Sequence, residues 1–340
     1  MSSATFVENE THLFEKKIGG HITILFTEFK KITRFYVLFH LFFAVLALAE
    51  IFSFAVFFSF WIHSAAIAFL IASFLLGGFS YFVLLSYFQT KKPQQLYELC
   101  QTFLTGCHGH LCTDDHLSLA HAIYRAVQQL DRMEGDYYVL PFSWNTLNTL
   151  LKKFSIYCHW YDVLKMKELL LFEALSEHLQ LIKKEPTDLE AHAALAEGYL
   201  KLASLYKEPT TTEEDAPPWI PPYYTTKPML DKLTKTCERA IEEFKIIEAY
   251  VPRDPWVHAQ LANVYHDLGE AEKEISEYET MLKISPQDRT VMFHLGVLYF
   301  QQGKTAQGLQ MYDHLHKLRD DKAPVLLSYY DIYDIRKHFD

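Results

Sequence analysis

Two long apolar runs near the N-terminus constrain this chain more than any other feature. Residues 35–62 carry a single formal charge, Glu50, and residues 65–88 carry none. Each run exceeds the roughly 20 residues that a helix needs to cross a hydrocarbon layer of ~30 Å. A soluble helix needs a polar face, and neither run has one. The sequence therefore predicts a transmembrane helical hairpin over residues 35–88, and a buried hairpin of a soluble protein is the alternative.

Basic residues around the hairpin indicate its orientation. Those at the outer ends of the two runs are Lys30, Lys31, Arg34, Lys91 and Lys92, and the turn holds none. Because Lys and Arg are enriched on the cytoplasmic side of a membrane, we expect both termini to be cytoplasmic. The polar N-terminal segment, residues 1–34, is unlike a cleavable signal peptide, which begins its apolar core within the first few residues.

The remainder of the chain is acidic and rich in helix-forming residues. Residues 1–92 have a net charge of +2 and residues 93–340 a net charge of −12. This balance, without a basic stripe, disfavours nucleic acid as a partner. Twelve Gly and 13 Pro are too few for a turn-dense β-sandwich, which favours an all-α chain. Five Cys, an odd number, indicate free thiols in a reducing compartment.

The C-terminal half contains an internal repeat of 34 residues, the distance from Pro252 to Pro286. One unit holds Leu261-Ala262, Tyr265, Leu268-Gly269, Ile275, Tyr278 and Leu282. The next holds Leu295-Gly296, Tyr299, Gly303, Gly308-Leu309, Tyr312 and Leu315. Each unit is laid out as two amphipathic helices with a turn at a glycine, so the period indicates a helical-repeat array.

At these residues the chain resembles the tetratricopeptide repeat (TPR) family, although Glu274 replaces a small residue and Asp320 replaces the closing Pro. The resemblance implies an all-α fold in which the hairpin precedes a TPR-like α-solenoid. The predicted order is a polar segment at 1–34, the hairpin at 35–88, a helical neck or degenerate repeat at 93–141, the array at 142–322 with a Pro-rich insertion at about 204–228, and a C-terminal capping helix at 323–340.

In the TPR family the first helix of each repeat lines a ligand groove, and matching positions carry this role over by resemblance. The protein-binding residues so implied are Trp256, Asn263, His266, Asp267, Phe293, Val297, Phe300 and Gln301. Asn263 has no basic companions in its repeat, which disfavours the acidic chaperone tails that some family members bind. The alternative is that Trp256, Phe293 and Phe300 pack against an adjoining helix or the insertion. Residues 216–224 of the insertion are apolar and Pro-rich, and suit either an occupant of this groove or an exposed loop.

The best candidate for chemistry lies between Cys107 and His116, where two Cys and three His are closely spaced. Thiolates and imidazoles at such spacing can enclose zinc. Buried thiols beside surface imidazoles at a helix–helix turn are the alternative. The sequence has no nucleophile elbow, P-loop, HExxH or dinucleotide fingerprint. We therefore expect no catalytic residue, no metal ligand, no cofactor and no enzyme activity.

These features favour a membrane-anchored scaffold or adaptor that binds a protein or peptide at the cytoplasmic face. A small-molecule substrate and nucleic acid are not expected. The alternative function is a metal-binding membrane enzyme or sensor that uses the Cys107–His116 cluster. We expect a multi-pass protein with two spans in a bacterial inner membrane. The hydropathy of the hairpin also resembles that of chlamydial inclusion-membrane proteins, which implies a host inclusion membrane instead.

The hairpin makes a topological prediction, because basic residues flank only its outer ends. A cysteine introduced at residue 2 and one introduced at residue 340 should react with a membrane-impermeant thiol reagent from the same side. A cysteine in the turn at residue 63 is the control and should react only from the other side. Labelling of the two ends from opposite sides would contradict a two-span hairpin.

Overall fold

The structure is a computed structural model that describes residues 2–59, 64–109, 116–131, 133–135, 137–138, 145–207 and 225–336. All regular structure in these ranges is helical, which confirms the predicted all-α class. The chain divides into two compact units. The first is built on Met1–Glu177, and the second on His178–Glu208 and Pro222–Asp340.

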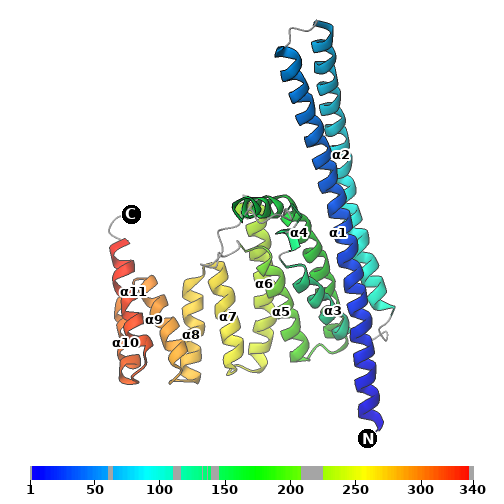
Figure 1. The fold of residues 1–340 in the computed structure, drawn as a ribbon. Coiled ribbons are helices and arrows are strands. Elements are labelled where there is room, and N and C mark those ends of the chain that lie inside the picture. Colours follow the sequence, from blue (N-terminus) through cyan, green and yellow to red (C-terminus); the bar gives the residue numbers. More distant parts are fainter. Residues whose placement is uncertain are drawn as a thin grey trace. The chain divides into compact units, whose positions relative to one another are not determined.

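Two very long helices dominate the first unit. Helix α1 spans Ser2–Ser59 and helix α2 spans Ser64–His108. They run side by side as a hairpin (Figure 1). Both contain a stretch that is long and apolar enough to cross a membrane, with a mean hydropathy of 2.2. Only 6% of the α1 stretch and none of the α2 stretch is buried by protein.

The polar side chains of the hairpin pair across its two helices. The hydroxyl of Ser73 on α2 donates to Oε1 of Glu50 on α1 at 2.7 Å. Further along, the Tyr36 hydroxyl donates to Oε1 of Gln95 at 2.8 Å, and the ammonium of Lys92 lies 5.0 Å from the centre of the Tyr36 ring. An aromatic ring beside a lysine is typical of a membrane–water boundary. Glu50 has its own hydrogen-bond partner, Ser73, within the apolar stretch.

The halves of α1 and α2 away from the hairpin turn form a packed seam. Its residues recur at alternating spacings of four and three, as in a coiled coil. They are Ile18, Ile22, Leu25 and Phe29 on α1 and Leu96, Cys100, Phe103 and Cys107 on α2, all at most 4% exposed. Residues 18–34, predicted only as a polar segment, thus belong to a helix that is continuous with the first apolar run.

Two further helices complete this core. Helix α3 spans His116–Gln129 and helix α4 spans Asn145–Lys184, with a short 3-10 turn, η1, at Met133–Gly135 between them. The two helices contribute Leu119, Ile123 and Ala126, and Met166, Leu170 and Ala174, all at most 1% exposed. The first unit therefore joins an apolar hairpin to a four-helix core through uninterrupted helices.

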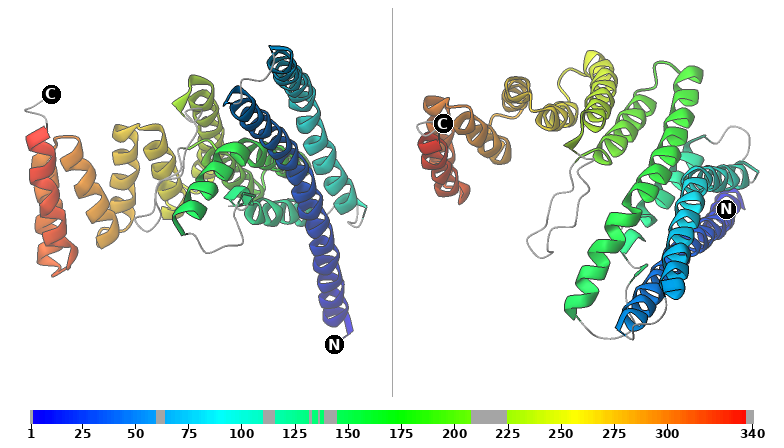
Figure 2. Two further views of the ribbon diagram at one scale, coloured as in Figure 1. Left: turned by 45° about the horizontal axis from the view of Figure 1, so that its top comes forward. Right: turned by 90° about the horizontal axis from the view of Figure 1, so that it is seen from above.

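The second unit is a series of shorter helices. They are α5 (Leu189–Ser204), α6 (Lys227–Tyr250), α7 (Pro255–Leu268), α8 (Ala271–Ile284), α9 (Arg289–Gln301), α10 (Thr305–Lys317) and α11 (Lys322–Arg336). From α5 to α10 each helix packs against the next one in sequence, and α11 packs against both α9 and α10 (Figure 2). The predicted insertion falls between α5 and α6, and residues 208–224 lie outside the described residues. The other predicted domain boundaries remain predictions.

Local signals recur where the first helix of a pair begins. Asp188, Asp254 and Asp288 each stand two residues after a Pro and cap α5, α7 and α9. Each carboxylate accepts a hydrogen bond of 2.9 Å from the amide two residues on, which satisfies an otherwise unpaired backbone donor. Pro-x-Asp therefore marks the start of each helix pair.

Glycines end two of these helices and allow others to pack closely together. Gly269 and Gly303 take the left-handed conformation, with φ of 70°, in the turns after α7 and α9. A Cβ at Gly308 on α10 would lie 2.6 Å from the Phe300 ring, and one at Gly296 on α9 would lie 2.6 Å from Leu326. These contacts pack α9 tightly against α10 and α11.

Removing core side chains from α9 tests this register. Leu295 is 1% exposed and Tyr299 is 4% exposed, so Leu295→Ala and Tyr299→Ala should each lower the free energy of unfolding by about 2–5 kcal/mol. Leu309→Ala on α10 is the matched control, because Leu309 is 39% exposed and should contribute less than about 1 kcal/mol. Denaturant unfolding of the purified full chain measures all three. Equal effects at the three positions would contradict the register.

Candidate functional site

The predicted groove positions lie on two helices, and those on α7 differ in their environment. Trp256 is 38% exposed, and its ring meets that of Phe244 edge-on at 5.8 Å. Asn263 and His266 are exposed on the same helix. Asp267 is half-buried and forms an ion pair with Lys207. The open part of this surface therefore consists of Trp256, Asn263 and His266.

His266 also accounts for a departure from the family pattern. Glu274 occupies a position where a small residue is expected, and it is 6% exposed. Nδ1 of His266 lies 3.2 Å from Oε1 of Glu274. Burial raises the pKa of Glu274, and His266 partly opposes that rise. A carboxylate is tolerated between α7 and α8 because an imidazole from the exposed face reaches it.

The predicted positions on α9 are largely covered by α11. Phe293 is half-buried, lies edge-on to Tyr329 at 6.4 Å, and has Lys322 5.7 Å above its ring. Phe300 is only 3% exposed and meets Tyr330 at 5.8 Å. For these two rings the structure follows the alternative prediction, packing against an adjoining helix. Phe300 lies inside the core because Gly308 leaves room for its ring.

Val297 and Gln301, also on α9, are half-buried. A ligand-binding role for the eight predicted groove residues remains a prediction. Residues 216–224 of the insertion, predicted either to occupy the groove or to form a loop, lie outside the described residues.

Two buried histidines in this unit have a matching arrangement. Nδ1 of His192 on α5 lies 2.6 Å from Oε2 of Glu243 on α6, and Nε2 lies 3.1 Å from the Pro186 carbonyl. His258 on α7 repeats this with Glu277 of α8 at 2.7 Å and the Pro252 carbonyl at 3.2 Å. Both ring nitrogens of each histidine are thus used, which indicates a structural role in joining paired helices.

In the described part of the Cys107–His116 cluster, the thiol and the imidazoles have different surroundings. Cys107 is 0% exposed and Cys100 1% exposed, and both thiols belong to the apolar core of the first unit. The histidines behave differently, because His108 and His116 both approach Glu177 of α4. His110 and Cys112 lie outside the described residues. The metal-binding alternative that uses this cluster therefore remains a prediction.

Comparison with known proteins gives no close relative. No protein-family model matches the chain, and no curated protein sequence matches it. Among solved structures, a thermophilic TPR protein of Thermus thermophilus is 18% identical, with a TM-score of 0.32, over 70% of this chain and 94% of that one. The MamA RS-1 ArsTM double mutant is 11% identical, with a TM-score of 0.32, over 67% of this chain and 94% of that one.

A third solved structure contains the TPR2AB domain of yeast Sti1 in complex with pHSP90. It is 14% identical, with a TM-score of 0.25, over 72% of this chain and 93% of that one. The fold of the second unit follows from its own helices: the pairs α7–α8 and α9–α10 start at Pro-x-Asp, turn at a glycine and repeat every 34 residues, and α5 starts at the same signal. Helices α5 to α10 therefore form a TPR-like α-solenoid.

The His192 pair predicts a pH-dependent contribution to stability. Burial alone would lower the pKa of His192, but its hydrogen bonds to Glu243 and the Pro186 carbonyl outweigh burial and raise that pKa. The stabilisation is therefore fully present below the unfolded-state pKa of about 6.5 and disappears as pH rises through the folded-state value. His192→Gln should lower the free energy of unfolding more at mildly acidic pH than at alkaline pH.

His294 provides a control of opposite sign for this measurement. Burial and the nearby Lys322 lower the pKa of His294, so its protonation disfavours the folded state as pH falls. His294→Gln should therefore improve relative stability under acid conditions. Denaturant unfolding at several pH values compares both variants with the unsubstituted chain. A His192→Gln effect that is independent of pH would rule out the charged pair.

Proposed function

We propose that this chain is a membrane-anchored scaffold whose helical array binds a protein or peptide. The observation that carries the proposal is the exposed apolar surface of the hairpin, on the same chain as a repeat array. Among the described residues, eight large side chains there are 63–74% exposed: Phe42, Leu48, Phe52, Phe69, Leu75, Leu76, Phe79 and Phe82. Exposing so many neighbouring apolar groups to water is unfavourable, at about 25 cal/mol per Å².

A bilayer is the environment that suits this surface. A core helix of a soluble protein would be largely buried by its own chain, whereas the two stretches here are 6% and 0% buried. Their backbone groups are satisfied within helices, as a hydrocarbon environment demands. The basic residues at the outer ends favour cytoplasmic termini. The membrane remains a bacterial inner membrane or, by the hydropathy resemblance, a host inclusion membrane.

The partner surface that we propose is the exposed part of α7, which we call the α7 face: Trp256, Asn263 and His266. A helical-repeat array offers such a face without chemistry of its own. An aromatic residue that is partly exposed beside hydrogen-bonding side chains is typical of an interface anchor. The exposed groups include no cluster of Lys or Arg, so an acidic tail does not suit the face. We assign the chain no catalytic function.

Site-specific crosslinking tests this proposal in membranes that contain the full chain. A photoreactive residue at Asn263 should give a discrete protein adduct in the membrane fraction. The same residue at Leu309, exposed on α10, is the control and should give none. Trp256→Ala should remove most of the Asn263 adduct, because truncating an anchor of this kind costs about 2 kcal/mol, or roughly 30-fold in affinity.

Two results would contradict the proposal. If mild alkali extracts the chain from membranes, the hairpin is not an anchor. If the Leu309 probe gives the same adducts as the Asn263 probe, the α7 face is not a specific binding surface.

A further inference from the structure

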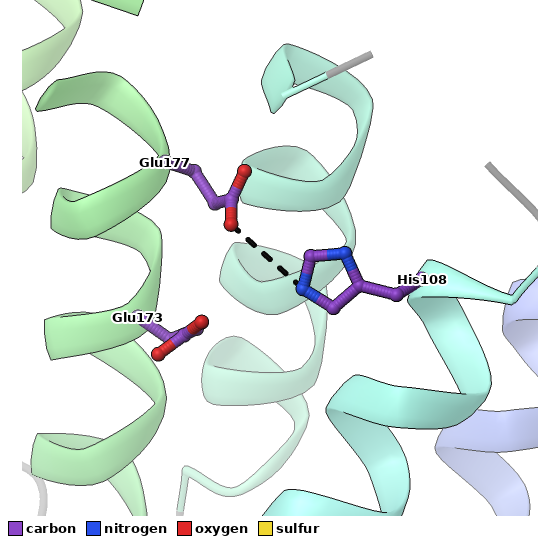
Figure 3. A group of neighbouring side chains, drawn as sticks. All are labelled: His108, Glu173 and Glu177. Carbon is purple, nitrogen blue, oxygen red and sulfur yellow. Dashed lines mark ion pairs between the residues drawn. The ribbon is translucent and has the colours of Figure 1, made fainter. Parts of the chain in front are cut away.

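Three helices of the first unit bring four possible metal ligands together. His108 ends α2, His116 begins α3, and Glu173 and Glu177 stand one turn apart on α4. Figure 3 shows the two carboxylates of α4 directed toward the end of α2 that carries His108. The residues come from positions up to 69 apart in the sequence, so only the fold assembles them.

The distances place one ligand atom from each of three residues in a small volume. One atom from His108, one from Glu173 and one from Glu177 lie within 4.8 Å of one another. Nε2 of His108 is 3.8 Å from Oε1 of Glu177. Ligands at 2.0–2.2 Å around a tetrahedral zinc ion stand roughly 3.4 Å apart. Small side-chain adjustments therefore suffice to close these groups around an ion.

The charge at this position also favours a cation. The Glu177 side chain is only 8% exposed, and Glu173 is half-buried. Among the described residues, no Lys or Arg forms an ion pair with either carboxylate. Two carboxylates one turn apart repel each other, and partial burial strengthens that repulsion. A divalent ion between them would remove it.

We propose that His108, Glu173 and Glu177 bind one divalent transition-metal ion of the Zn²⁺ class. His116 acts through Glu177, because its Nδ1 lies 2.6 Å from Oε2 of that carboxylate and leaves Oε1 facing His108. Hydrogen bonds of this kind orient ligating carboxylates. The ion would join α2, α3 and α4 in the core of the first unit.

A second His/Glu group in the chain already contains a positively charged side chain. Glu248, His258 and Glu277 meet the same distance limit. There Lys245 Nζ already lies 2.7 Å from Glu248 and 3.3 Å from Glu277. Both nitrogens of His258 are used by Glu277 and the Pro252 carbonyl. That group has its own cation and no free imidazole nitrogen, so it serves as the matched control.

Of the three ligands proposed here, only His108 belongs to the cluster that the sequence suggested, whereas Glu173 and Glu177 come from α4. Cys107 is buried in the apolar core and does not belong to the group of ligand atoms that lie within 4.8 Å of one another. Imidazole and carboxylate ligands without sulfur suit Zn²⁺ and its Co²⁺ substitute. Three protein ligands also leave a position for water.

Metal titration of the purified full chain in detergent tests the site. After treatment with a chelator, the protein is titrated with Co²⁺ and separately with Zn²⁺, and bound metal is quantified by mass spectrometry. We expect one tight equivalent, a cobalt spectrum without a thiolate charge-transfer band, and a rise in melting temperature with Zn²⁺. Glu177→Gln and Glu173→Gln should each abolish tight binding. His116→Ala should weaken binding by about 10–100-fold.

Matched variants separate this site from the other histidines and cysteines. Glu277→Gln, in the control group, and Cys112→Ser should leave the tight equivalent unchanged. Glu173 is half-buried, so Glu173→Gln should fold normally, and its melting temperature without metal verifies this. The proposal is overturned if the chain binds no metal at micromolar concentration, if both glutamine variants at α4 still bind tightly, or if Cys112→Ser removes the site.

Discussion

The seam between α1 and α2 is the contact on which the rest of the first unit depends. Leu25 and Phe29 pack with Phe103 and Cys107 in one core, to which α3 and α4 add their apolar faces. The same two helices continue without interruption into the apolar stretches of the hairpin. No linker separates the segment suited to lipid from the segment suited to water, so the seam positions both. A cavity in this seam would disturb the His/Glu group as well, because His108 directly follows Cys107.

The repeat array is predictable from sequence, whereas the seam carries a weaker signal. The array repeats Pro, Tyr and Gly every 34 residues, and each has a fixed local role: Pro before the cap, Tyr between helices and Gly at the turn. The seam also has a period, since Ile18, Ile22, Leu25 and Phe29 alternate by four and three. Its first half lies in a stretch that reads as polar overall, and its second half begins just after the second apolar run. The period covers fewer than two heptads in each helix, residues 18–29 and 96–107, which is too short to predict a coiled coil.

The candidate sites were less predictable because they depend on contacts between distant residues. Spacing assigned Phe300 to a groove, but a glycine on α10 and a tyrosine on α11 enclose its ring. The sequence of α9 does not indicate which of its faces the terminal helix, α11, covers. Likewise, the Cys107 thiol lies in the apolar core, whereas the imidazole of the next residue, His108, approaches the Glu177 carboxylate of α4. In the sequence, Glu173 and Glu177 resemble the solvated face of an ordinary helix. Only the fold brings imidazoles close to them.

Helix α1 is much longer than the thickness of a bilayer core. Its 58 residues extend about 87 Å at a rise of about 1.5 Å per residue, whereas a bilayer core is only ~30 Å thick. Outside that length, Ile18, Ile22, Leu25 and Phe29 pack α1 into one core with α2, α3 and α4. On the α2 side, His108 follows the last residue of the apolar run, Phe88, by 20 positions, or about 30 Å. With the apolar run in a bilayer, this spacing would keep the His/Glu group of the first unit clear of the lipid headgroups.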